Sequence, residues 1–144
     1  MSTVARILLG FAFVVFSANY FVPFLPAPAP PPPNAMSFLG AFAGSGLLTF
    51  VKTIELVTGL LLLSNRFVPL ALALLAPILV GITLFHILLE PSGLVVPLAL
   101  VALEIVLAWS YRDAFAPMLR ARTAAKPVLP AAARREPAVA GASS

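Results

Sequence analysis

The sequence predicts an all-α membrane protein, a bundle of four transmembrane helices with both termini in the cytoplasm. Of its 144 residues, 61% are hydrophobic and 10% are charged, and the mean hydropathy is +1.07. Soluble domains are only about 45–50% apolar and about 25% charged, so we expect lipid to surround most of this chain. The apolar residues fall into four runs of 17 to 23 residues each, at 4–22, 47–63, 67–89 and 94–111. A helix that crosses a bilayer needs roughly 20 residues, and no run alternates as a β-barrel strand does.

The first run, 4–22, is interrupted by Arg6 near its start and by Asn19 near its end. Its alternative interpretation is a secretory signal peptide, because a basic residue precedes the apolar stretch and small residues follow at 27–29. Cleavage would leave three spans and place the basic C-terminal tail on the wrong side of the membrane. We therefore expect the first helix to be retained.

An outer loop joins the first two runs. Residues 23–33 include seven prolines among eleven residues, which predicts an extended polyproline strap. Residues 34–46 are apolar, and they either lie along the outer membrane interface or extend the second helix by two turns. In either case Ser37 is a candidate cap for this segment.

The third and fourth runs each have one distinguishing feature. Pro77 lies in the middle of the third run, where it removes a backbone hydrogen bond. Trp109 and Tyr111 close the fourth run and are expected to form an aromatic belt at the inner interface. Gly59 and Gly81 are expected where helices approach one another closely.

The basic residues set the orientation. With four spans, Arg6, Arg66 and the tail lie on one side, while Glu90 lies on the other. The basic residues of the tail are Arg112, Arg120, Arg122, Lys126, Arg134 and Arg135. Because cytoplasmic segments are enriched in Lys and Arg, both termini should be cytoplasmic, in a bacterial-type inner (plasma) membrane. We divide the chain into a transmembrane domain, 1–113, and a basic Ala/Pro-rich tail, 114–144, which should be disordered beyond about Arg122.

Polar residues inside the apolar runs are the candidate functional residues. They are Asn19, Lys52, Glu55, His86 and Glu104. A charge in the middle of a membrane costs about 2.5–3.5 kcal/mol, so such residues usually face a protein interior. Counting about 1.5 Å per residue places all five in the outer half of the bilayer. We expect them to form a polar pocket, with Lys52 paired to Glu55 three residues later and His86 beside Glu55 or Glu104.

Several chemistries are excluded or disfavoured by composition. The chain has no cysteine and one histidine, so it offers neither thiolate chemistry nor a haem held by two of its own histidines. No spacing within one helix suggests a metal site, and no glycine-rich phosphate loop follows a strand. No catalytic residue is therefore assigned. Nucleic acid is not an expected partner, because the basic residues are diffuse and lack interleaved aromatic residues.

Segment 51–70, VKTIELVTGLLLLSNRFVPL, resembles the second and third helices of DoxX-like membrane proteins. That family has a Glu before a Gly-Leu-Leu-Leu stretch and then a short basic turn. Ala76-Pro77-Ile78, His86 and Glu104 extend the resemblance to about residues 4–112. It implies a four-helix membrane bundle, and some relatives resemble subunits of thiosulfate- or quinone-linked oxidoreductase assemblies.

The first functional hypothesis is an accessory subunit of a quinone-linked membrane redox assembly, rather than a stand-alone enzyme. Its polar pocket would hold a quinone headgroup, and its partners would be redox subunits, a second copy of the chain and the lipid bilayer. Three alternatives remain: proton-coupled movement of a small solute, a purely structural scaffold, and a membrane enzyme that uses a Glu as acid and base.

Overall fold

The computed structural model describes residues 2–26 and 28–121, and within these ranges the chain is all-helical with no strand. The predicted all-α class is therefore confirmed for the described residues. The helices are α1 (Ser2–Phe21), α2 (Pro33–Gly44), α3 (Leu47–Leu63), α4 (Val68–Leu88), the 3-10 helix η1 (Pro91–Gly93), α5 (Val95–Ser110) and α6 (Arg112–Phe115). The tail residues expected to be disordered, 122–144, lie outside the described ranges.

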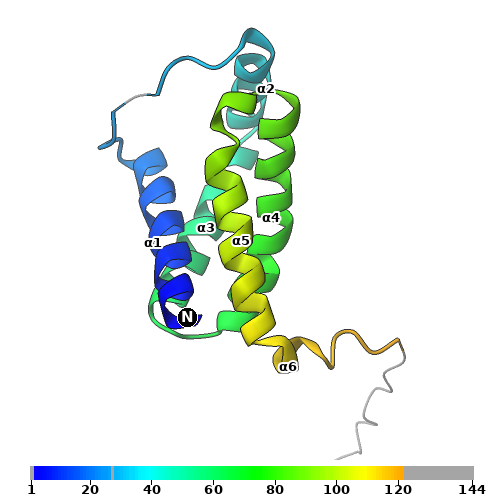
Figure 1. Cartoon of the computed structure of the whole chain (residues 1–144). Helices are drawn as coiled ribbons and strands as arrows, with labels where there is room; N and C mark the ends of the chain where they lie inside the picture. Colours follow the sequence, from blue (N-terminus) through cyan, green and yellow to red (C-terminus); the bar gives the residue numbers. More distant parts are fainter. Residues whose placement is uncertain (1, 27, 122–144) are drawn as a thin grey trace, which may run out of the picture.

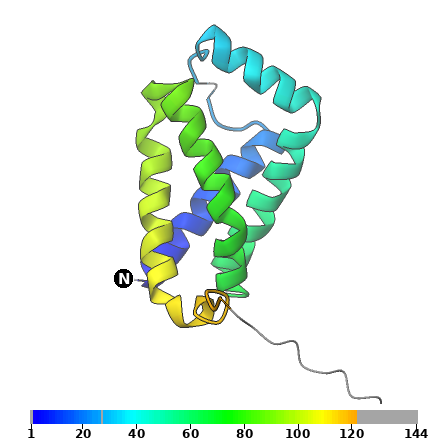
Figure 2. The same ribbon diagram turned by 90° about the vertical axis from the view of Figure 1, so that its right-hand side faces the viewer.

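Four helices form a bundle, with α2 at one end and α6 at the other (Figure 1). Helix α1 packs against α3 and α5, and α4 packs against the same two helices, so the order around the bundle is α1, α3, α4, α5. Helix α1 crosses the direction of α4 and α5 obliquely (Figure 2). The start of α1 and the short α6 lie at the same end of the bundle.

Two helices are long and apolar enough to cross a membrane by themselves, α1 with 20 residues and α4 with 21. Helices α2 and α3 pass the same test together as a bent pair, with an angle of 81° between them. Helix α5 is equally apolar but has only 16 residues, about 24 Å at 1.5 Å per residue. The structure thus has two helices capable of spanning a membrane, or three if the bent pair is one span.

Helix α2 excludes one of the two interpretations of residues 34–46, the extension of the second helix. It is a separate helix that begins at Pro33 and ends at Gly44, not a straight extension of α3. The chain turns at Gly46, whose φ of 80° favours glycine because it has no Cβ. The expected capping role of Ser37 is wrong, since its hydroxyl lies within the helix and donates to the carbonyl oxygen of Pro33 at 2.9 Å. Before α2, residues 23–26 and 28–32 contain neither helix nor strand.

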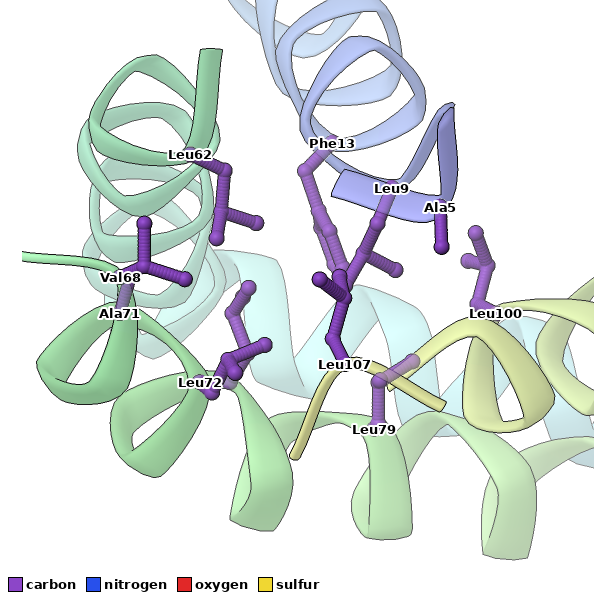
Figure 3. Packing of buried hydrophobic residues seen from close by; sticks show 11 residues of the cluster. Ala5, Leu9, Phe13, Leu62, Val68, Ala71, Leu72, Leu79, Leu100 and Leu107 are labelled. Atoms are coloured by element: carbon purple, nitrogen blue, oxygen red, sulfur yellow. The ribbon is translucent and has the colours of Figure 1, made fainter. Parts of the chain in front are cut away.

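The bundle core is built of aliphatic side chains and one phenylalanine from all four long helices (Figure 3). Its members are Ala5, Leu9, Phe13, Leu62, Val68, Ala71, Leu72, Leu75, Leu79, Leu100 and Leu107. Inside a bilayer, lipid tails are as apolar as these side chains, so close packing and hydrogen bonds must hold the helices together.

The closest helix contact joins α1 and α3 through two glycines. A Cβ on Gly10 would lie 3.0 Å from the carbonyl oxygen of Gly59, and a Cβ on Gly59 would lie 2.9 Å from Val14 Cγ2. The expectation of a close approach therefore holds at Gly59. It is wrong at Gly81, where a Cβ would meet nothing within 4 Å. Helix α4 runs through Pro77 without ending.

Arg6 of α1 also binds the last turn of α3. Its guanidinium donates to the carbonyl oxygens of Leu62 and Leu63, the last residues of α3. Carbonyls in the last turn of a helix lack the usual partner within the helix, and a cation there also complements the helix dipole. Leu62 additionally accepts a hydrogen bond from the backbone N–H of Asn65 at 3.2 Å.

Candidate functional site

A polar cluster lies between α1 and α3, centred on Glu55. This side chain is only 1% exposed. Its Oε2 accepts hydrogen bonds from Lys52 Nζ at 2.7 Å and from Ser17 Oγ at 3.1 Å. Lys52 and Glu55 are three residues apart on α3, a spacing that brings both onto one face, whereas Ser17 comes from α1. The predicted Lys52–Glu55 ion pair is present, and Ser17 connects it to the neighbouring helix.

A second polar contact lies in the same interface, nearer the α2 end of the bundle. Tyr20 on α1 and Thr49 on α3 share a hydrogen bond of 2.7 Å between their hydroxyls. The α1–α3 interface therefore has hydrogen bonds towards the α2 end of the bundle and the Gly10–Gly59 contact towards the other end.

Glu104 is the second buried carboxylate. It is 8% exposed and lies on the face of α5 that buries Pro97, Leu100 and Leu107. Among the described residues nothing donates a hydrogen bond to it, and its Oε1 is fully enclosed without a partner. Glu55 Oε1 is likewise enclosed and unpartnered. Because buried polar atoms are nearly always hydrogen-bonded, two free carboxylate oxygens in one small bundle require an explanation.

His86 is not beside either buried acid. Its Nε2 lies 3.2 Å from Glu90 Oε2, one turn further along the chain, and its Nδ1 lies 2.9 Å from the carbonyl oxygen of Ile82. Both ring nitrogens thus face oxygen atoms, and His86 pairs with Glu90 and not with a buried acid of another helix. Gly93 packs so tightly here that a Cβ would lie 2.5 Å from Glu90 Oε2.

Asn19 also has a local role instead of a place in the pocket. Its Oδ1 accepts hydrogen bonds from the backbone N–H groups of Phe24 at 2.9 Å and Leu25 at 2.8 Å. These bonds fold the start of the proline-rich strap back onto the end of α1.

The expected five-residue pocket is therefore divided into separate parts. Lys52 and Glu55 meet, and Glu104 is buried in the bundle without a hydrogen bond to either of them. Asn19 and His86 make local contacts near the C-terminal ends of α1 and α4. Sequence reasoning missed Ser17. Its signal was the four-residue spacing that continues the buried stripe of Ala5, Leu9 and Phe13.

Across residues 2–26 and 28–121, no three His, Asp or Glu side chains gather to form a potential metal site. What the bundle offers instead is acceptor chemistry, namely two buried carboxylate oxygens without a hydrogen-bond partner. Such oxygens can accept a hydrogen bond from a ligand hydroxyl or take up a proton. No protein-family model, curated protein or solved structure matches the chain. The resemblance to DoxX-like proteins stays a prediction.

Proposed function

We propose that the chain is an integral membrane protein that crosses the bilayer four times and acts as an accessory subunit of a quinone-linked redox assembly. In this proposal Glu104 accepts a hydrogen bond from the headgroup of a quinol. Both termini lie on the cytoplasmic side of a bacterial-type inner membrane.

The arrangement of the helices supports four crossings. Helices α3 and α5 lie beside α1 and α4 in one ring, so a bilayer around the two longer helices would also surround the two shorter ones. Helix α5 exposes large apolar side chains outward, among them Val95, Leu98 and Ile105. Regions of this kind are stable only in lipid or against another protein.

The charge distribution supports the orientation. Arg6 binds the inner end of α3, Arg66 follows in the next turn, and Arg112 begins α6 at the same end of the bundle. At the opposite end, the acidic Glu90 is paired with His86. Because positive residues concentrate on the cytoplasmic side, the end that carries α6 faces the cytoplasm.

The observation that carries the functional part is the unpartnered, buried carboxylate of Glu104. A lone charge enclosed in a membrane bundle is costly unless something pairs with it. A quinol fits this chemistry, since its two hydroxyls are donors and its flat ring suits apolar surroundings. The resemblance to proteins associated with quinone-linked assemblies points to the same ligand.

The test is titration of the purified protein with a short-chain quinol. Glu104→Gln keeps the shape of the side chain but replaces an ionisable acceptor with a neutral one. A hydrogen bond to the neutral acceptor is weaker by about 1 kcal/mol, so the affinity for the quinol should fall about fivefold. Glu90→Gln makes the same change at the outer end and should leave affinity unaltered. Equal affinities for Glu104→Gln and the unmodified chain would exclude this role.

The assembly itself is tested by co-purification from native membranes under mild detergent. We expect redox subunits to accompany the full-length chain in fixed proportion. Recovery of the chain alone, or only with copies of itself, would count against the accessory-subunit proposal.

One observation favours a second candidate, a purely structural scaffold. Glu55 is already held by Lys52 and Ser17, and the Gly10–Gly59 contact fixes the same helix pair. In a scaffold the quinol would not bind, and Glu104 substitutions would change stability without changing the composition of any complex.

A further inference from the structure

The outer segment between α1 and α3 combines apolar exposure with a complete lack of charge. Residues 7–51 contain no Asp, Glu, Lys, Arg or His. Five large apolar side chains between the two helices are exposed: Val22, Phe24, Leu25, Met36 and Phe38. A loop that faces water usually has charged residues, so this composition indicates a less polar environment.

The dimensions of the bundle place α2 at the boundary between the hydrocarbon core and the lipid headgroups. Helix α3 has 17 residues, about 26 Å, which is shorter than a hydrocarbon core of about 30 Å. Its outer end at Leu47 therefore reaches no further than the boundary of that core. Helix α2 leaves α3 at 81° and lies across the outer end of the bundle, roughly parallel to the membrane plane (Figures 1 and 2).

One side of α2 is fixed to the bundle and another is free. Ala35 is fully buried, and the ring of Phe38 lies 5.7 Å from that of Phe85 on α4. Met36 is 51% exposed, and one turn later a Cβ on Gly40 would meet nothing within 4 Å. The Phe38–Phe85 contact holds the helix at a fixed height, while the side with Met36 and Gly40 is available to the surroundings.

We propose that α2 is an interfacial helix that binds the headgroup and upper acyl region of the outer lipid leaflet. Interfacial helices insert their apolar side about 5–10 Å into this region. Most of them also use Lys and Arg to attract anionic lipid, but α2 has neither. Its lipid contact therefore depends on apolar area alone and is independent of anionic lipid and of salt. The proposal relies on the four crossings of the proposed function, not on quinol binding.

The test uses single-tryptophan variants in phosphatidylcholine vesicles. Trp109→Phe removes the one native tryptophan, and Met36→Trp then reports on the free side of α2. Phe11→Trp, at a 61% exposed position in the middle of α1, is the matched control for a crossing helix. Lipids brominated either near the glycerol or near the chain ends quench tryptophan at the corresponding depth.

We expect Met36→Trp to be quenched most by the shallow bromines and Phe11→Trp most by the deep ones. Adding anionic lipid or salt should change neither. If Met36→Trp is quenched by aqueous iodide and by neither brominated lipid, the interfacial role of α2 is wrong. It is also wrong if, at high protein density, Met36→Trp is shielded from iodide and from both lipids, as in a contact between copies of the chain. If Phe11→Trp escapes the deep bromines, the crossing itself fails. Gly40→Trp repeats the measurement one turn along α2 should Met36→Trp not fold.

Discussion

Two buried carboxylates lie on opposite helices of the bundle, and their surroundings differ. Glu55 on α3 is 1% exposed and receives hydrogen bonds from Lys52 and Ser17. Glu104 on α5 is 8% exposed and receives none from the described part of the chain. One acid has a cation and a hydroxyl as partners, whereas the other lies on a helix face whose remaining buried residues are leucine and proline.

The difference is one between an acid that the fold explains and an acid that it does not. The position of Glu55 is explained within the fold, because its charge is paired with Lys52 and the cluster connects α1 to α3. Nothing within the described fold explains Glu104. A residue that is costly to bury and makes no hydrogen bond to the described part of the chain is the better candidate for binding something from outside.

The largest effect on stability is expected from a substitution of Glu55. Glu55→Leu leaves Lys52 without its anion and Ser17 without its acceptor, and we expect the free energy of unfolding to fall by about 3 kcal/mol. The measurement is reversible unfolding in mixed micelles. Adding Lys52→Met to this variant should restore most of the loss, since the unpaired cation is then gone. A single variant as stable as the unmodified chain would show that the pair contributes nothing.

Packing at α1–α3 can be tested separately from the ion pair. Gly59→Ala places a Cβ 3.0 Å from the carbonyl oxygen of Gly10, and this backbone atom cannot move aside. We expect a loss of about 2 kcal/mol in the same unfolding assay. Gly81→Ala is the control, because open space surrounds that position, and it should leave stability unchanged or slightly raised. Equal effects at both glycines would contradict the close helix approach.

Ser17 sharpens the comparison because it is the partner that α1 provides. Ser17→Ala removes one hydrogen bond to a charged acceptor and should lower the free energy of unfolding by about 1.5 kcal/mol. Ser110→Ala is the matched control, since that hydroxyl is exposed and donates to the carbonyl oxygen of Val106 in its own helix. A Ser17 effect as small as the Ser110 effect would mean that Glu55 does not depend on α1.

The smallest effect on stability is expected at Glu104, and it has the opposite sign. Glu104→Leu exchanges an unpaired buried acid for an apolar side chain, so the free energy of unfolding should stay constant or rise by up to about 1 kcal/mol. Unfolding in mixed micelles decides this as well. A clear destabilisation would reveal a partner that Glu104 holds in the folded protein, and the contrast with Glu55 would disappear.

Patterns within one helix were readable from the sequence, and contacts between helices were not. The apolar runs predicted helices where α1, α3, α4 and α5 lie, and the three-residue spacing predicted the Lys52–Glu55 pair. The His86–Glu90 contact also has local spacing, four residues, although we expected His86 beside an acid of another helix. The Ser17–Glu55 bond depends on the register of α1 against α3, which the Gly10–Gly59 contact helps to fix and no local pattern encodes. The direction of α2 follows from a single backbone angle at Gly46.

The most direct test of the contrast between these acids measures how far a short-chain quinol raises the melting temperature. Three proteins are compared: the unmodified chain, Glu104→Leu, and the double variant Lys52→Met with Glu55→Leu. A ligand that binds only the folded state raises its free energy of unfolding by RT ln(1 + L/Kd), where L is the free ligand concentration. We predict that the rise is lost in Glu104→Leu and kept in the double variant. A rise that persists in Glu104→Leu, or that disappears only in the double variant, would contradict the assignment of Glu104 to the ligand and Glu55 to the fold.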